Sequence, residues 1–307
     1  MMKKTDFIVL SSFDKLPLHA TMYEPNDGIT PKAVLQFCHG MCEHKGRYEE
    51  LIAYFVERGY AAVMHDYRGH GETAQTQEDV GYFGDTTASA VVQDAVQITR
   101  YAKEKYPNLP VYLFGHSMGS MVVRCYLQQY DHFIDKLVVC GSPSQNPLAP
   151  IAIGLTKCIA FFKGERHQSS LLRFLSIGNG DKKFPGEGKD AWLSKNRESV
   201  EAYHADSKCG FTFTCNGFEN LFRLLQNTYD KSLYQVKNPA LPIFFVSGSD
   251  DPVMISQDKW LQSHAFLRSV GYENVAGKLY HGDRHEICNE LDREKVYADL
   301  LAFFERG

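Results

Sequence analysis

The chain has 307 residues, of which 44% are hydrophobic and 23% charged, so it can bury a large core and has the composition of an ordinary globular protein. Its 33 basic and 37 acidic residues give a formal net charge of −4, which excludes the strongly basic surface expected of a nucleic-acid-binding protein. It has neither a run of about 18 apolar residues nor a signal-peptide pattern, and its eight cysteines form no Cys-x-x-Cys pair, which favours free thiols in a reducing cytoplasm.

Eight short apolar segments are predicted to form β-strands, and segments of helical period separate the later ones. The expected strands are 6–10, 18–23, 33–39, 60–66, 111–115, 136–141, 243–248 and 275–281. The expected core helices are 47–59, 87–107, 118–130, 256–271 and 286–307. This alternation predicts an α/β fold with a mostly parallel sheet covered by helices on both faces. Because no helix separates the first two strands, we expect the sheet to begin with an antiparallel pair.

The alternation of strands and helices is interrupted between about residues 142 and 216. This stretch is too long for a plain loop, because structureless loops above about 15 residues are uncommon in compact domains. Its helix-like pieces cover 151–162, 169–178 and 190–204. We therefore predict a helical cap over residues 142–216, on the carboxyl ends of the strands and inserted between core segments 1–141 and 217–307. The segment 217–230 is expected to return the chain to the core.

The stretch VYLFGHSMGSMVV (111–123) places Ser117 between Gly115 and Gly119, directly after an expected strand and at the start of an expected helix. A Gly-x-Ser-x-Gly match alone is a weak signal. In this strand–turn–helix context it is typical of a nucleophile elbow, whose strained turn tolerates only small residues beside the serine. The pattern favours Ser117 as a nucleophile over a serine in an ordinary turn.

A nucleophilic serine requires a base and an acid that orients the base, and in such folds these follow later strands in the order acid, then histidine. Asp250 and Asp251 follow the strand at 243–248, and we favour Asp251 because it lies deeper in the loop, before Pro252. His281 and His285 compete for the role of base, and we favour His285 because it lies in the loop before the last helix.

Two backbone N–H groups are expected to form the oxyanion hole. One belongs to Met118, which follows the nucleophile, and the other to Met41, in the loop after the third strand. In the same loop, His39 and His44 lack the accompanying ligands of a metal site, so structural roles are favoured for both. We expect neither a metal nor a cofactor.

Five segments together resemble a known family. They are HGMCEHKGRY (39–48), HDYRGHGE (65–72), GHSMGS (115–120), GSDDPV (248–253) and RHEICNE (284–290). The chain thereby resembles α/β-hydrolases of the monoacylglycerol lipase and lysophospholipase group, which are related to the serine aminopeptidases. The resemblance implies the α/β-hydrolase fold, a triad of Ser117, Asp251 and His285, and an oxyanion hole from the Met41 and Met118 amides. It covers nearly the whole chain except the cap.

The sequence departs from the family pattern at two places. Glu72-Thr73 stands where the family usually has a serine, and His281 stands where a proline often precedes the loop glycine. Members of such families hydrolyse monoacylglycerols, lysophospholipids, simple esters or short peptides, and the cap distinguishes among these substrates.

The cap segment 147–164 is apolar on most faces, so it is expected to pack within the cap, to line an acyl channel or to dock on a lipid surface. Candidate substrate contacts are His39, Phe161, Phe162, Phe211 and Phe213. An acyl pocket would favour a lipid-like ester. A peptidase would instead need carboxylates to hold a free amino terminus, for which Glu165, Glu187 and Glu198 are the candidates.

We therefore predict a cytoplasmic serine ester hydrolase that forms an acyl-enzyme on Ser117. The expected partner is a small-molecule ester or lipid-like substrate, with no nucleic acid and at most transient contact between the cap and a membrane surface. The alternatives are an aminopeptidase or amidase with the same triad, a small-ester carboxylesterase, a non-catalytic ligand-binding protein, and a membrane-surface protein that acts through its cap.

Overall fold

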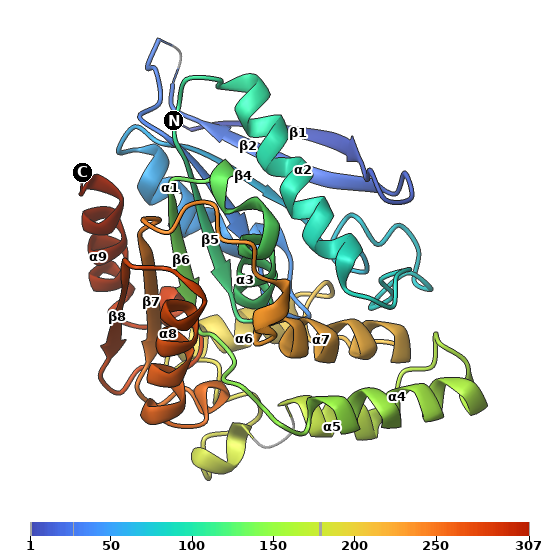
Figure 1. Cartoon of the computed structure of the whole chain (residues 1–307). Helices are drawn as coiled ribbons and strands as arrows, with labels where there is room; N and C mark the ends of the chain where they lie inside the picture. The colour runs from blue at the N-terminus through green and yellow to red at the C-terminus, as the bar shows by residue number, and fades with distance from the viewer. Residues whose placement is uncertain (1, 27, 178–179, 307) are drawn as a thin grey trace.

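The computed structural model describes residues 2–26, 28–177 and 180–306. Its sheet has eight strands in the order β1-β2-β4-β3-β5-β6-β7-β8 (Figure 1). The strands are β1 (Lys3–Leu10), β2 (Pro17–Glu24), β3 (Val34–Cys38), β4 (Ala61–His65), β5 (Val111–His116), β6 (Lys136–Cys140), β7 (Ile243–Gly248) and β8 (Val275–Tyr280). The pairs β1–β2 and β2–β4 are antiparallel, and all the other pairs are parallel. The predicted mostly parallel sheet with an antiparallel start is confirmed.

Helices cover both faces of the sheet. One face packs against α1 (Glu49–Val56) and α9 (Arg293–Glu305), and the other against α2 (Ser89–Lys105), α3 (Met118–Tyr130) and α8 (Gln257–Val270). Successive side chains of a strand point to opposite faces, so Leu113 and Phe114 of β5 are both buried but belong to different cores. This two-sided burial explains why the parallel strands appear in the sequence as continuous apolar runs.

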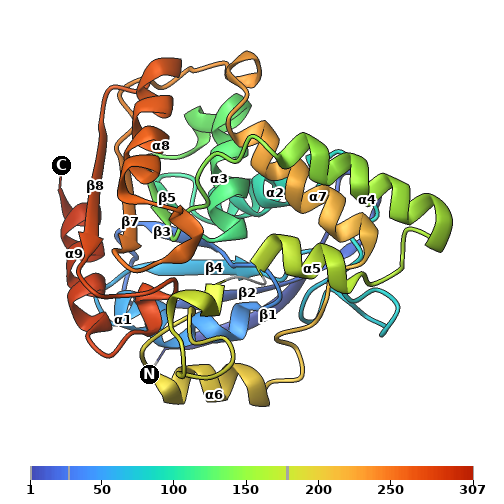
Figure 2. The same ribbon diagram turned by 90° about the horizontal axis from the view of Figure 1, so that it is seen from below.

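Three α-helices lie between β6 and α7 (Cys215–Thr228) in the residues that the structure describes. They are α4 (Ala149–Lys163), α5 (Ser170–Ile177) and α6 (Arg197–Ala205), and they gather at the end of the sheet where the parallel strands end (Figures 1 and 2). Helix α7 packs against both α4 and α3, so it joins this layer to the core. The cap boundaries 142–216 remain a prediction, and residues 178 and 179 lie outside the described residues.

Short 3-10 helices complete the described parts of the chain. They are η1 (Lys45–Tyr48), η2 (Asp131–Phe133), η3 (Gly180–Lys183), η4 (Lys231–Leu233), η5 (Pro252–Met254) and η6 (Ile287–Asn289). No helix in the described ranges is both long and apolar enough to cross a membrane.

The helix expected at 190–204 begins only at Arg197. The Asp181 carboxylate accepts the backbone N–H groups of Asp190 and Trp192, and the Glu290 carboxylate accepts that of Lys195. Side chains outside the segment therefore hold these backbone donors, Asp181 from shortly before it and Glu290 from far along the chain, and the segment before α6 forms turns instead of helix.

Candidate active site

Ser117 lies in the tight turn between β5 and α3, with a φ of 53° and a ψ of −116°. A β-carbon on Gly115 would overlap the Gly119 carbonyl oxygen, and one on Gly119 would overlap the Cys38 carbonyl oxygen. The Ser117 N–H donates to the Cys140 carbonyl oxygen at 3.0 Å. Both glycines are thus required by close backbone approach, and the turn holds Ser117 in a strained conformation at the end of the strand.

Asp251 and His285 are brought together by the loops after β7 and β8. Asp251 Oδ2 accepts the Nδ1–H of His285 at 3.0 Å and the Ser247 hydroxyl at 3.1 Å, and its Oδ1 accepts the Val253 N–H at 2.8 Å. Both Asp251 and His285 are buried. Burial of the carboxylate raises the pKa of Asp251, but the charge and hydrogen bond of His285 outweigh burial and hold this pKa below its ordinary value. Asp251 therefore remains ionised and fixes the His285 proton on Nδ1, which leaves Nε2 free as a base.

The competing residues lie elsewhere. The Asp250 side chain accepts a hydrogen bond from the neighbouring Ser249 hydroxyl, and the Asp250 carbonyl oxygen accepts from Lys183. His281 is exposed at the end of β8. The geometry therefore joins Asp251 to His285 and leaves Asp250 and His281 out of the arrangement.

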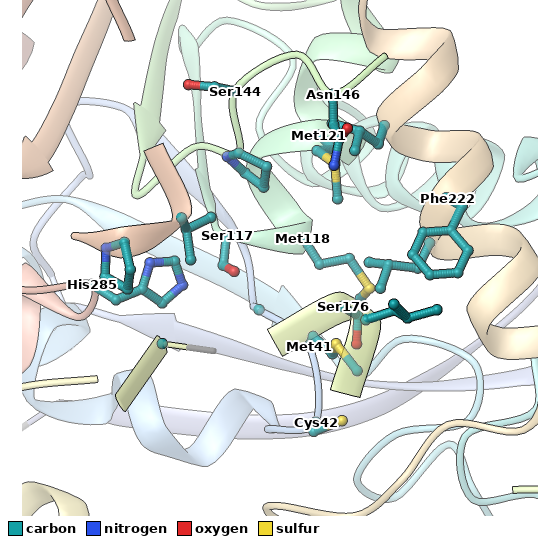
Figure 3. A pocket seen from close by; sticks show the side chains of 18 of the residues that line it. Met41, Cys42, Ser117, Met118, Met121, Ser144, Asn146, Ser176, Phe222 and His285 are labelled. Atoms are coloured by element: carbon teal, nitrogen blue, oxygen red, sulfur yellow. The ribbon is translucent and has the colours of Figure 1, made fainter. Parts of the chain in front are cut away.

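A cavity of about 490 Å³ lies at the carboxyl end of the sheet, and Ser117, His285, Met41 and Met118 all line it (Figure 3). Ser117 is half-buried, and its hydroxyl forms no hydrogen bond among the described residues. It is therefore accessible to a molecule in the cavity.

Apolar stripes of three helices form much of the cavity wall. They comprise Leu148, Ile151, Ala152 and Leu155 at the start and along one face of α4, Phe174 and Leu175 on α5, and Leu221, Phe222 and Leu225 on α7. The sequence analysis singled out none of these residues, although it gave lining of an acyl channel as one possible role of segment 147–164. Their spacing of three and four residues is the one available signal, but α4 is apolar on most faces, which hides the stripe that faces the cavity.

None of the five candidate substrate contacts lines the cavity. Phe161 and Phe162 are 83% and 78% exposed near the end of α4. Phe211 and Phe213 instead pack their rings against His70, at centroid distances of 5.2 Å.

His39, the fifth candidate, is fully buried and serves a structural purpose. Its Nδ1–H donates to the Gly40 carbonyl oxygen at 2.8 Å, and its Nε2 accepts the Tyr67 N–H at 3.1 Å. Both ring nitrogens are therefore satisfied by the backbone of the loops that surround the site.

Trp192 is a further lining residue that the sequence analysis missed. Its ring centroid lies 4.9 Å from that of His285, and its carbonyl oxygen accepts the backbone N–H of His285 at 3.3 Å. A residue between β6 and α7 thus covers the proposed base.

One group in the described chain has the composition of a metal-binding cluster. His44, Asp206 and Cys209 place possible ligand atoms within 4.8 Å of one another. His44 Nε2 and Asp206 Oδ2 are already joined at 2.7 Å, and none of the three lines the cavity. A hydrogen bond between the loop after β3 and the end of α6 accounts for the proximity of His44 and Asp206, and the expected lack of a metal remains a prediction.

The sheet order, the elbow at Ser117 and the histidine–carboxylate pair define an α/β-hydrolase. The chain belongs to the family described as serine aminopeptidase, S33, whose model matches residues 29–292. It is 26% identical to the monoglyceride lipase of Rattus norvegicus over 85% of this chain and 78% of the rat protein. It is also 26% identical to the monoacylglycerol lipase of Mycolicibacterium smegmatis, over 89% of this chain and 88% of that protein.

Among solved structures, the chain is similar to a highly thermostable carboxyl esterase from Bacillus coagulans in complex with glycerol. The TM-score is 0.90 and the identity 25%, with 99% of this chain and 98% of that chain covered. These likenesses confirm the predicted fold and family, and the chain is a serine hydrolase.

Proposed function

We propose that this serine ester hydrolase cleaves monoacylglycerol-like or lysophospholipid-like esters and places their acyl chain in the apolar cavity. The observation that carries the proposal is the cavity of about 490 Å³, because apolar stripes of α4, α5 and α7 line it and Ser117 and His285 lie in its wall. Pockets that bind small molecules are mostly apolar with a few well-placed polar groups, which is the composition an acyl ester requires. The names of the relatives support the same substrate class.

The proposed reaction uses Ser117, Asp251 and His285 as a triad. His285 Nε2 takes the hydroxyl proton as Ser117 Oγ bonds to the ester carbonyl carbon, and the Met41 and Met118 N–H groups bind the resulting oxyanion. The bond to the alcohol then breaks, and His285 returns the proton to the leaving oxygen. Water, deprotonated by His285, hydrolyses the acyl-enzyme and restores Ser117.

The positions of the carboxylates weigh against an aminopeptidase. Glu165 accepts from Tyr82 at the surface, Glu187 accepts from Arg284, and neither these two nor Glu198 lines the cavity. The carboxylates that do line it, Glu43 and Glu286, are both paired with Arg47. No carboxylate of the described lining is therefore left unpaired to hold a free amino terminus.

We also propose that the cavity mouth makes transient contact with lipid aggregates. Leu148, Ile151, Phe174 and Leu175 belong to the cavity lining, yet each is about half or more exposed. Phe161 and Phe162 extend the exposed apolar surface along α4. Exposed apolar patches of this kind are typical of interaction sites.

A reducing compartment such as the cytoplasm is proposed from the cysteines. All eight are free, and six of them are buried, where a thiol behaves as a small apolar side chain.

The substrate class is tested with a panel of monooleoylglycerol, lysophosphatidylcholine, a short-chain alkyl acetate and an aminoacyl p-nitroanilide. The wild type is compared with Ser117→Ala and with Ser269→Ala, in which the exposed Ser269 of α8 serves as a matched control. We expect cleavage of the two lipids by the wild type and by Ser269→Ala, and loss of cleavage in Ser117→Ala. Faster cleavage of the anilide than of either lipid would overturn the ester assignment.

A further inference from the structure

A buried charge network lies behind the active site, formed by Glu43, Arg47, Glu286 and His116. Arg47 Nη1 donates to Glu43 Oε2 at 2.6 Å and to Glu286 Oε1 at 2.7 Å, and its Nη2 donates to Glu286 Oε2 at 2.8 Å. The side chains are between 4% and 10% exposed. Burying charges is costly, and an apolar cluster of the same size is often at least as stable, so stability alone does not explain this network.

The network contacts three of the segments that form the site, namely those that carry Met41, Ser117 and His285. Glu43 Oε1 accepts the N–H of Gly40, which precedes Met41, and a β-carbon on Gly40 would lie only 2.6 Å from that oxygen. His116 immediately precedes Ser117, and its Nε2 lies 3.3 Å from the His285 carbonyl oxygen. Glu286 immediately follows His285.

Hydrogen-bond donors and acceptors indicate the charge of His116. The His285 carbonyl oxygen can only accept, so His116 Nε2 carries a hydrogen. The Tyr48 hydroxyl donates its one hydrogen to Glu43 Oε1 at 2.8 Å. At its 3.1 Å contact with His116 Nδ1 the hydroxyl oxygen must therefore accept, so Nδ1 of His116 also carries a hydrogen. His116 is then an imidazolium, and two carboxylates are balanced by two cations.

The pKa directions agree with this assignment. Burial favours neutral forms, but the hydrogen bond and charge of Glu43 raise the pKa of His116 above its usual value. Burial likewise opposes the ionised carboxylate, yet the Arg47 charge and the His116 hydrogen bond hold the pKa of Glu43 well below its ordinary value.

We propose that Glu43 and Arg47 are positioning residues that hold the Gly40–Met41 backbone and the His285 loop in register with Ser117. The inference rests on the proposed catalytic roles of Ser117, His285 and the Met41 amide. Glu43 fixes the peptide that precedes the Met41 N–H, and Arg47 ties Glu43 to the residue after His285. The network thus acts on the oxyanion donor and the base together, without touching the substrate's reacting atoms.

The test compares Glu43→Gln, Arg47→Met and Arg47→Lys with Glu50→Gln as the matched control. Glu50 pairs with Arg293 at the surface and is 64% exposed, so its loss is expected to leave kcat unchanged. We expect Glu43→Gln and Arg47→Met to lower kcat by about tenfold to a hundredfold, with KM changed by less than about threefold. Arg47→Lys keeps the charge but loses the bidentate contact, so it is expected to recover part of kcat.

A second readout is the rate at which a fluorophosphonate labels Ser117. That rate depends on the nucleophile and the oxyanion hole and not on the ester class, so it tests the network even where the proposed substrate is wrong. We expect the labelling rate to fall by about the same factor as kcat, in variants whose circular dichroism shows them folded at the assay temperature. Arg47→Lys serves as the second variant where Glu43→Gln does not fold. The inference would be overturned if the folded variants kept the wild-type labelling rate and kcat, or if only their KM changed.

Discussion

At the scale of single residues, Asp251 determines which nitrogen of His285 can act as a base. Its Oδ2 holds the Nδ1–H at 3.0 Å, while its Oδ1 caps η5 through the Val253 N–H. An amide at this position could donate to Nδ1 and stabilise the tautomer that carries its proton on Nε2. The base would then be blocked without any large change in packing.

We therefore expect Asp251→Asn to lower kcat by about 10³- to 10⁴-fold while the protein remains folded. Steady-state kinetics on an ester that the wild type cleaves provides the measurement. Asp250→Asn is the matched control, because the Asp250 side chain does not contact His285, and it is expected to retain wild-type kcat. Equal losses in the two variants would remove Asp251 from its proposed role.

The sequence allowed the site to be predicted where the chemistry is local. Gly115 and Gly119 are required by backbone contacts within and beside the elbow, so the motif carries its own structural reason. Asp251 was distinguished from Asp250 by its place before Pro252, which opens η5. Substrate contacts were not predictable in this way, because the exposure of Phe161 and the burial of Phe213 depend on how distant segments pack.

At the scale of elements, α4 serves two surfaces. Ile151 and Leu155 line the cavity, whereas Phe161 and Phe162, further along the helix, are exposed to solvent. Phe161 and Phe162, the outer part of the proposed lipid contact, can therefore be changed without altering the cavity lining.

We expect the double variant Phe161→Ser/Phe162→Ser to bind phosphatidylcholine vesicles more weakly, because two exposed aromatic rings would no longer be buried in the lipid interface. Its kcat on a water-soluble ester is expected to equal that of the wild type, since neither ring lines the cavity. Co-sedimentation with vesicles measures the first quantity. Unchanged vesicle binding would place the lipid contact elsewhere or exclude it.

The strands were predictable from sequence, and the segment before α6 was not. The buried strands β3 to β7 appear as apolar runs because both of their faces pack against helices. The backbone N–H groups of Asp190 and Lys195, in contrast, are held by Asp181 and Glu290, so the structure there depends on partners that no local pattern reveals.

At the scale of the whole molecule, buried neutral histidines make stability depend on pH. Burial lowers the pKa of His65 to about 3, of His70 to about 3 and of His264 to about 4, from a usual value of 6.5. Below about pH 6.5 the unfolded chain binds protons at these positions and the folded chain does not, so stability falls as the pH falls. The raised pKa of His116 has the opposite sign and offsets part of this loss.

Each of the three histidines is expected to lower the free energy of unfolding by about 2 kcal/mol between about pH 6.5 and pH 5. Urea unfolding across this range measures the slope for the wild type and for His264→Phe. On acidification, His264→Phe is expected to lose less stability than the wild type. Its slope of unfolding free energy against pH is expected to be smaller by the equivalent of up to about one bound proton. An identical slope in the two proteins would show that His264 titrates normally in the folded state.

The central claim is that Ser117 cleaves esters whose acyl chain fills the apolar cavity. The most direct test is kcat/KM for monoacylglycerols from butanoyl to oleoyl, measured for the wild type and for Ala152→Trp, which narrows the cavity at α4. We predict that kcat/KM of the wild type rises toward medium or long chains, and that Ala152→Trp loses the long-chain substrates while it retains the shortest. A wild type that prefers butanoyl, or a variant with an unchanged chain-length profile, would contradict the account.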